Sequence, residues 1–287
     1  MNQSKIMITQ FPKISAIYYG LIQSGYDYYS IERKSDHIDC LKRYIDKEQF
    51  SGFFAGTRQE TCKVYPYWPR AAILENATFY LSDDNKRFHD FELFRRNIMS
   101  ASNISDDERS EFLWDWIRTF PKAIGDVLHN WNFIKYIEYE KEWIREQNDA
   151  YFQELNTIKN CLEICISKYK SPVQDIKICI NPIKCVYSAD YYLVGSTFIF
   201  TSGAFNRDSI IHEFLHHVVH PIIKQEKTLI LEKEFTDSSF DDSYYLSGGN
   251  AGRLNAFEEI VVRSLTKAIA HGKYPSDMRA YVGSFLR

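Results

Sequence analysis

The chain has 287 residues, of which 45% are hydrophobic and 25% charged, with a formal net charge of −3. This composition is ordinary for a globular protein of one large domain or two smaller ones, and the charge gives no electrostatic basis for binding nucleic acid or an anionic membrane surface. Polar residues interrupt every apolar run well before the ~18 residues that a transmembrane helix needs. The six cysteines, without an apolar signal sequence at the N-terminus, are expected to be reduced thiols, which predicts a cytoplasmic protein.

Residues 1–170 are expected to form a mainly helical N-terminal region. Apolar residues recur there at spacings of three and four, which is the period of an amphipathic helix. The segments with this pattern are residues 15–23, 36–49, 91–100, 105–119 and 138–170. The three histidines of this region stand alone in the sequence and are expected to be structural or surface side chains: His37, His89 and His129.

The pattern changes after Pro172. Residues 176–180 alternate between apolar and polar side chains, residues 191–201 form a second run of strand-forming residues, and both are expected to be strands. A helix is expected from about Asp208 to Pro221, followed by a polar loop and a long helix over residues 252–271. The sequence therefore predicts an α+β protein, with a second region at residues 171–287.

The most informative motif lies in this second region, at His212-Glu213-Phe214-Leu215-His216. On a helix, two histidines separated by four positions lie on one face and can bind a single zinc ion. Glu213 would then lie beside the metal, where it could take a proton from a zinc-bound water. This HExxH arrangement is typical of enzymes that hydrolyse amide bonds.

A helical wheel supports a metal site over a chance match. At about 100° per residue, the imidazoles and Glu213 occupy one arc of the helix, and the apolar residues occupy the opposite arc. Solvated faces normally carry lysine and glutamate, whereas four of the eight histidines of this chain lie between residues 212 and 220. The apolar arc consists of Ile210, Ile211, Phe214, Leu215, Val218 and Val219.

A catalytic zinc site needs a third protein ligand. The metzincin pattern would place a histidine or aspartate six residues after His216, but Ile222 stands there. His220 is on the correct face, yet three histidines along one straight helix do not easily converge on one ion, so a supporting role is expected for it.

Two glutamates of the later helix remain as candidates for this ligand. On the wheel Glu258 lies among apolar residues, where a carboxylate needs a cation such as zinc. Glu259 lies at the border of the apolar arc, one turn before Arg263. The residue pattern alone leaves both open.

From Ile176 to Arg263 the chain resembles the gluzincins, which are HExxH…E zinc metallopeptidases, and among them a little-characterised bacterial family of predicted peptidases. Residues 209–217, which follow a strand, and residues 259–264 carry the resemblance. It implies a zincin-like core made of a small sheet, an active-site helix and a glutamate-bearing helix. It also implies zinc as the cofactor, and it favours Glu259 over Glu258 as the third ligand. Arg263 stands where thermolysin-like enzymes carry an aspartate, so that aspartate's role is not carried over.

The resulting hypothesis is zinc-dependent hydrolysis of a peptide or protein substrate, with Glu213 as the general base. In resembling enzymes the strand before the active helix, here residues 196–201, forms the edge of the sheet and pairs with the substrate. The residue pattern alone fits an ordinary core strand equally well, so both interpretations stay open. The alternative is a non-catalytic zinc-binding regulatory or interaction protein with a zincin fold, which the presence of Glu213 disfavours. Four residues stay open as the group that stabilises the oxyanion: Tyr244, Tyr245, His217 and His220.

Overall fold

A computed structural model describes residues 6–24, 52–54, 70–102, 108–184, 189–233 and 249–286. Helices and a small sheet together confirm the α+β class. The helices are α1 (Pro12–Gln23), α4 (Arg70–Thr78), α5 (Phe91–Ser102), α6 (Glu108–Arg118), α7 (Phe120–Leu128), α8 (Trp131–Ala150), α9 (Phe152–Tyr169), α10 (Arg207–Gln225), α11 (Lys227–Glu232), α13 (Gly249–Ala270) and α14 (Met278–Gly283). The strands are β1 (Asp175–Ile180), β2 (Ala189–Val194) and β3 (Thr197–Ser202).

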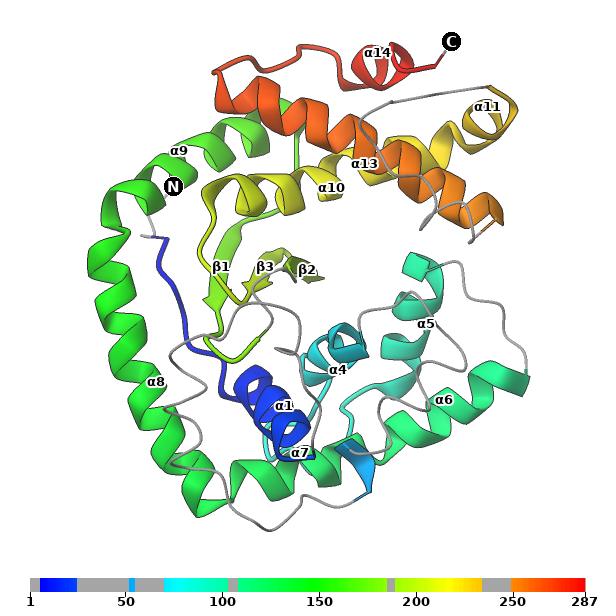
Figure 1. The fold of residues 1–287 in the computed structure, drawn as a ribbon. Coiled ribbons are helices and arrows are strands. Elements are labelled where there is room, and N and C mark those ends of the chain that lie inside the picture. Colours follow the sequence, from blue (N-terminus) through cyan, green and yellow to red (C-terminus); the bar gives the residue numbers. More distant parts are fainter. Residues whose placement is uncertain are drawn as a thin grey trace.

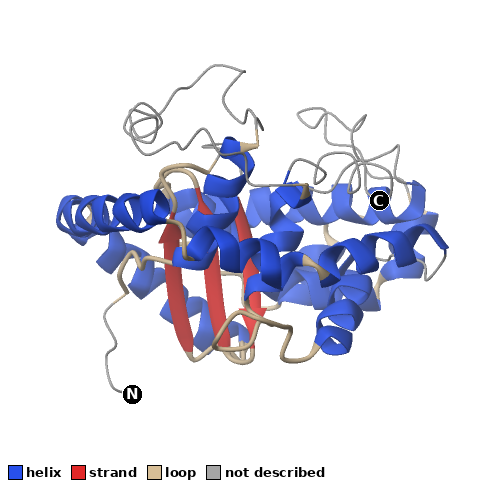
Figure 2. Cartoon of the chain, turned by 90° about the horizontal axis from the view of Figure 1, so that it is seen from below, coloured by secondary structure: helices blue, strands red, loops and turns tan. Residues whose placement is uncertain are grey.

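The three strands form one sheet in the order β1-β3-β2 (Figure 2). β3 runs parallel to β1 and antiparallel to β2, so it is hydrogen-bonded on both sides. Of the two interpretations of residues 196–201, the edge strand is therefore wrong and the ordinary core strand is confirmed. The segment read as one strand is a hairpin, because Gly195 adopts a φ of 61° that suits a tight turn between β2 and β3.

The sheet lies between two sets of helices, with α10 and α13 on one side and α1 and α4 on the other (Figure 1). Successive side chains of a strand point to opposite faces. Phe198 and Phe200 accordingly pack with α10, whereas Thr201 points to α4, where its hydroxyl donates to Glu75. The face that carries α10 is the one that positions the histidines.

Two large hydrophobic cores, beside a small cluster of Ala256 and Ile260, contain most of the buried apolar side chains of the described residues. One contains α9, the inner face of the sheet, α10 and α13, and the other contains α1 and α4 to α7. α8 joins them, because Tyr136 belongs to the second core and Ile144 to the first. Leu162 on α9 packs in the core of α10, although the sequence assigns it to the N-terminal region. The boundary at residue 170 stays a prediction.

Several helices differ from their predicted bounds. The helix expected over residues 138–170 is two helices, α8 and α9, which meet at Tyr151. α10 does not end at Pro221 but continues to Gln225. Proline removes one backbone donor, yet the next turn still buries Ile223 in the core. The expected helix at residues 36–49 lies outside the described residues.

A buried cluster of charged side chains joins the N-terminal helices to the sheet. Lys184 is fully buried, and its Nζ lies 2.7 Å from Asp190 Oδ2 on β2 and 2.9 Å from Glu75 Oε1 on α4. Burial alone would lower the pKa of Lys184, but Asp190 and Glu75 raise it above its ordinary value, so the amine is charged. Three hydroxyl groups complete the cluster, those of Tyr18, Tyr192 and Thr201.

A second buried carboxyl group should make the stability of the protein depend on pH. Burial raises the pKa of Glu140 from 4.5 to about 7, against the lowering effect of hydrogen bonds such as that from Ser15. The folded state therefore holds this proton more tightly than the unfolded state. The protonated Glu140 contributes its full stabilisation below about pH 4.5, the unfolded pKa, and this stabilisation is lost as the pH rises through about 7, the folded pKa. The loss in the free energy of unfolding is about 3 kcal/mol.

Glu140→Gln is expected to remove this part of the pH dependence. Denaturant unfolding at pH 5 and pH 8 measures it, as the difference in the free energy of unfolding between variant and wild type. The exposed neighbour Glu142, replaced by glutamine, is the matched control. Identical pH profiles for wild type and Glu140→Gln would contradict the prediction.

In the described part of the chain, none of the helices combines the length and the apolar composition needed to cross a bilayer.

Candidate metal centre

The HExxH motif lies on α10, as the sequence predicts. The helix begins after Asn206, whose side chain accepts a hydrogen bond from the backbone N–H of Ser209 at 2.9 Å. Phe214 and Leu215 are fully buried and anchor one face of the helix in the core. The opposite face, with the histidines, is left only partly covered.

α13 packs along α10 and brings the two glutamates to this face (Figure 1). Its apolar side is fixed in the core by Phe257, Val261 and Leu265, which are fully buried. This packing directs Glu258 and Glu259 towards the histidines of α10.

Three side chains converge at one point of this contact. His212 Nε2 lies 3.1 Å from His216 Nε2, while Glu259 places Oε1 3.2 Å from His216 Nε2 and Oε2 3.5 Å from His212 Nε2. These three residues form a group that could hold a metal ion. Ligands that bond a tetrahedral zinc at about 2.0–2.1 Å are about 3.3 Å apart. The group therefore offers nitrogen and oxygen ligand atoms, all within 4.8 Å of one another, which is compatible with binding one metal ion.

Glu258 contacts the Nδ1 atoms of His216 and His220, on the side of the His216 ring opposite to its Nε2. Its Oε1 lies 2.8 Å from His216 Nδ1, and its Oε2 lies 2.7 Å from His220 Nδ1. The two glutamates thus reach opposite nitrogens of the His216 ring, and only Glu259 joins the group of three. The ligand role of Glu259 stays a prediction, but the geometry separates the two candidates that the sequence left open.

The carboxylates of Glu258 and Glu259 favour a positive charge at His216 and at the position between the three side chains. Burial alone would lower the pKa of His216, but its contacts with Glu258 and Glu259 outweigh this effect and raise the pKa to about 10. Burial would likewise raise the pKa of Glu259, but the contacts with His212 and His216 hold it well below its usual range. A proton or a metal cation would each satisfy the same carboxylates, so the two compete for the site.

Glu213 lies beside this group on α10. Burial raises its pKa from 4.5 to about 8, with Asp190 and Glu259 adding to the shift and His216 opposing it. Within the described segments, no side chain or backbone group donates a hydrogen bond to the Glu213 carboxyl. A carboxyl group with a pKa near neutrality can both accept and return a proton at physiological pH.

Tyr191 is a neighbour of the site that sequence reasoning missed. Its ring stacks on that of His216, with centroids 6.3 Å apart and planes 9° from parallel. Burial raises its pKa, and the nearby carboxyl groups of Glu258 and Glu213 add to this, so the hydroxyl stays protonated. Alternation along β2 would have placed Tyr191 on the face of α10, had the hairpin at Gly195 been recognised.

The four residues left open as stabilisers of the oxyanion differ in their relation to the site. His217 Nε2 lies 3.0 Å from Ser171 Oγ, and His217 lines a separate cavity with Pro221 and Met278, so it does not join the metal-ligating group. His220 is held by Glu258. Tyr244 and Tyr245 lie outside the described residues.

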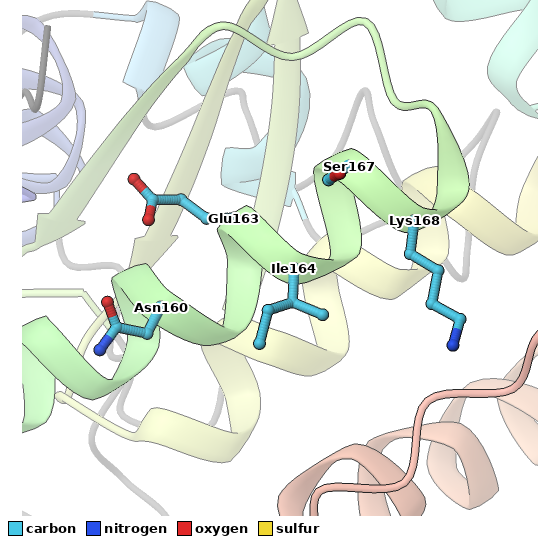
Figure 3. A pocket seen from close by; sticks show the side chains of 5 residues that line it. All are labelled: Asn160, Glu163, Ile164, Ser167 and Lys168. Atoms are coloured by element: carbon cyan, nitrogen blue, oxygen red, sulfur yellow. The ribbon is translucent and has the colours of Figure 1, made fainter. Parts of the chain in front are cut away.

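Two cavities elsewhere contain no member of the group. One of about 470 Å³ is lined by Asn160, Glu163, Ile164, Ser167 and Lys168 of α9 (Figure 3). The other, about 520 Å³, lies where the end of α9 meets α10 and the residues around the start of α14.

No protein-family model, no curated protein and no solved structure matches the chain. The chemistry of the site must therefore be inferred from its own residues.

Proposed function

We propose that the protein is a zinc metallopeptidase of the gluzincin type. His212, His216 and Glu259 would hold the zinc, and Glu213 would be the general base. The observation that carries the proposal is the mutual spacing of the three donor groups, 3.1, 3.2 and 3.5 Å, directly beside a carboxyl group. Three protein ligands with one remaining position are typical of catalytic zinc, whereas structural sites are closed by four.

The chemistry divides between the metal and the chain. Bound zinc would supply a Lewis acid that lowers the pKa of water and polarises the substrate carbonyl. Glu213 would take a proton from the attacking water and deliver it to the leaving amine. The Tyr191 hydroxyl, protonated and close to His216, is a further candidate to donate a hydrogen bond to the oxyanion.

β2 is the strand suited to bind the substrate backbone. It is the outer strand on one side of the sheet, and among the described residues only β3 pairs with it. An extended peptide can add to such an edge by main-chain hydrogen bonds. Because Tyr191 of β2 stacks on His216, a peptide along this edge would pass close to the proposed metal.

Metal removal tests the proposal. We expect the purified protein to contain about one zinc per chain and to cleave members of a peptide library, as read by mass spectrometry. A chelator should abolish cleavage, and added zinc should restore it. Failure to bind zinc, or equal zinc binding by His212→Ala, would overturn the assignment of the site. Zinc binding without any cleavage would instead favour the non-catalytic regulatory or interaction protein.

A further inference from the structure

Glu258 is a buried carboxylate with a histidine on each oxygen. Its side chain is 8% exposed, and its two oxygens lie 2.8 Å from His216 Nδ1 and 2.7 Å from His220 Nδ1. A buried charge is costly unless it is paired and hydrogen-bonded. Both Nδ1 atoms are therefore expected to be protonated and to donate a hydrogen bond to Glu258.

This contact determines which nitrogen of His216 can bind a metal. A ring that donates from Nδ1 has its Nε2 lone pair available for coordination. That Nε2 atom lies 3.1 Å from His212 Nε2 and 3.2 Å from Glu259. Consecutive side chains on a helix point about 100° apart, which lets Glu258 and Glu259 reach opposite nitrogens of the one ring.

His220 completes the arrangement on the second oxygen of Glu258. It lies one turn after His216 on α10, so the carboxylate of α13 contacts two successive turns of the same helix face. His220 is 31% exposed and contacts none of the three proposed ligands among the described hydrogen bonds and ion pairs. Its contact with the site is through Glu258.

We propose that Glu258 is a positioning residue for the metal, which fixes the tautomer and ring orientation of His216, and that His220 holds Glu258 in place. The inference rests on the proposed metal site but not on peptide hydrolysis. It assigns different work to two adjacent glutamates: Glu259 binds the metal, and Glu258 prepares the imidazole that binds it. Carboxylate partners of metal-bound histidines typically change metal affinity by about 10- to 100-fold.

Metal binding by single variants tests this assignment. Zinc affinity is measured by competition with a chromophoric chelator, ligand geometry by the visible spectrum of the Co²⁺ form, and folding by the melting temperature without metal. Glu258→Gln is expected to weaken zinc binding about 10- to 100-fold and to keep the Co²⁺ spectrum. Glu259→Gln is expected to weaken binding more and to change the spectrum. Glu163→Gln, at an exposed residue of the α9 cavity (Figure 3) that contains none of the proposed ligands, is the matched control and should match wild type.

Variants of His220 test the second contact. His220→Leu cannot donate to Glu258 and should weaken zinc binding in the same direction as Glu258→Gln, but by less. His220→Gln can donate through its amide and should recover most of the affinity. Recovery by glutamine would support a positioning role, because a merely structural change would not depend on the donor.

The outcomes that overturn the inference are distinct from those that overturn the function. If Glu258→Gln abolished zinc binding while Glu259→Gln kept it, Glu258 would be the ligand. If Glu258→Gln bound zinc as wild type does, no positioning role would exist. If wild type bound no zinc, the proposed function would fail together with this inference. Loss of peptide cleavage alone would leave the assignment of Glu258 standing.

Discussion

Replacement of Glu213 by glutamine is expected to lower the rate of peptide cleavage by about 10²- to 10⁴-fold, the usual contribution of a general base. The amide has nearly the same shape as the carboxyl group but cannot accept the proton of the attacking water. The proposed ligands His212, His216 and Glu259 are unchanged, so zinc content should remain close to that of wild type. Turnover of a peptide identified in the library and metal analysis of the same sample together measure both effects.

Peptide turnover and zinc content, measured together, distinguish a loss of the general base from a loss of the metal. Glu163→Gln removes an exposed carboxylate of α9, in a cavity that contains none of the proposed site residues, and should leave both turnover and zinc content unchanged. Full activity of Glu213→Gln would refute the general-base role. Loss of zinc along with activity would show that Glu213 supports the metal site rather than the proton transfer.

The second large effect is expected on stability, from Lys184→Met. Methionine fills a similar volume but leaves Glu75 and Asp190 without the cation that lies 2.9 and 2.7 Å from them. Removing one partner of a buried ion pair costs about 3–5 kcal/mol, because the remaining charge stays buried and uncompensated. Guanidinium unfolding, with the free energy of unfolding extrapolated to water, measures the loss.

Two further variants make this prediction specific to the cluster. Lys177→Met removes an exposed lysine of β1 and should change the free energy of unfolding by less than about 0.5 kcal/mol. Adding Glu75→Gln to Lys184→Met should recover part of the loss, since it removes one of the unpaired charges. Equal effects of Lys184→Met and Lys177→Met would contradict a stabilising role for the cluster.

The sequence predicts the local part of the site well. HExxH spacing and the segregation of apolar and imidazole residues depend only on helical periodicity, and α10 confirms that helix. The choice between Glu258 and Glu259 could not be made from periodicity, because the wheel places Glu258 among apolar residues and Glu259 at their border, and both contact the histidines of α10. Only the packing of the two helices determines which carboxylate meets Nε2 and which meets Nδ1 of His216.

Features that depend on distant partners were not predictable. Tyr191 was missed because Gly195 divides an apparently continuous strand into β2 and β3. Lys184 would ordinarily be placed on the surface, since lysine is rarely buried without a partner. Its partner Glu75 lies on α4, far away in the sequence, and no local pattern links the two residues.

The Lys184 cluster also bears on how the protein could be shortened for study. A fragment that begins near residue 171 would keep Lys184 and Asp190 but lose Glu75. It would also expose to solvent the face of the sheet opposite to the proposed metal site. Cys179 and Ile183, now buried against the N-terminal helices, would meet water. We therefore expect such a fragment to aggregate or to be cleared by proteolysis. We expect the smallest stable fragment with the proposed metal site to include α1 and α4.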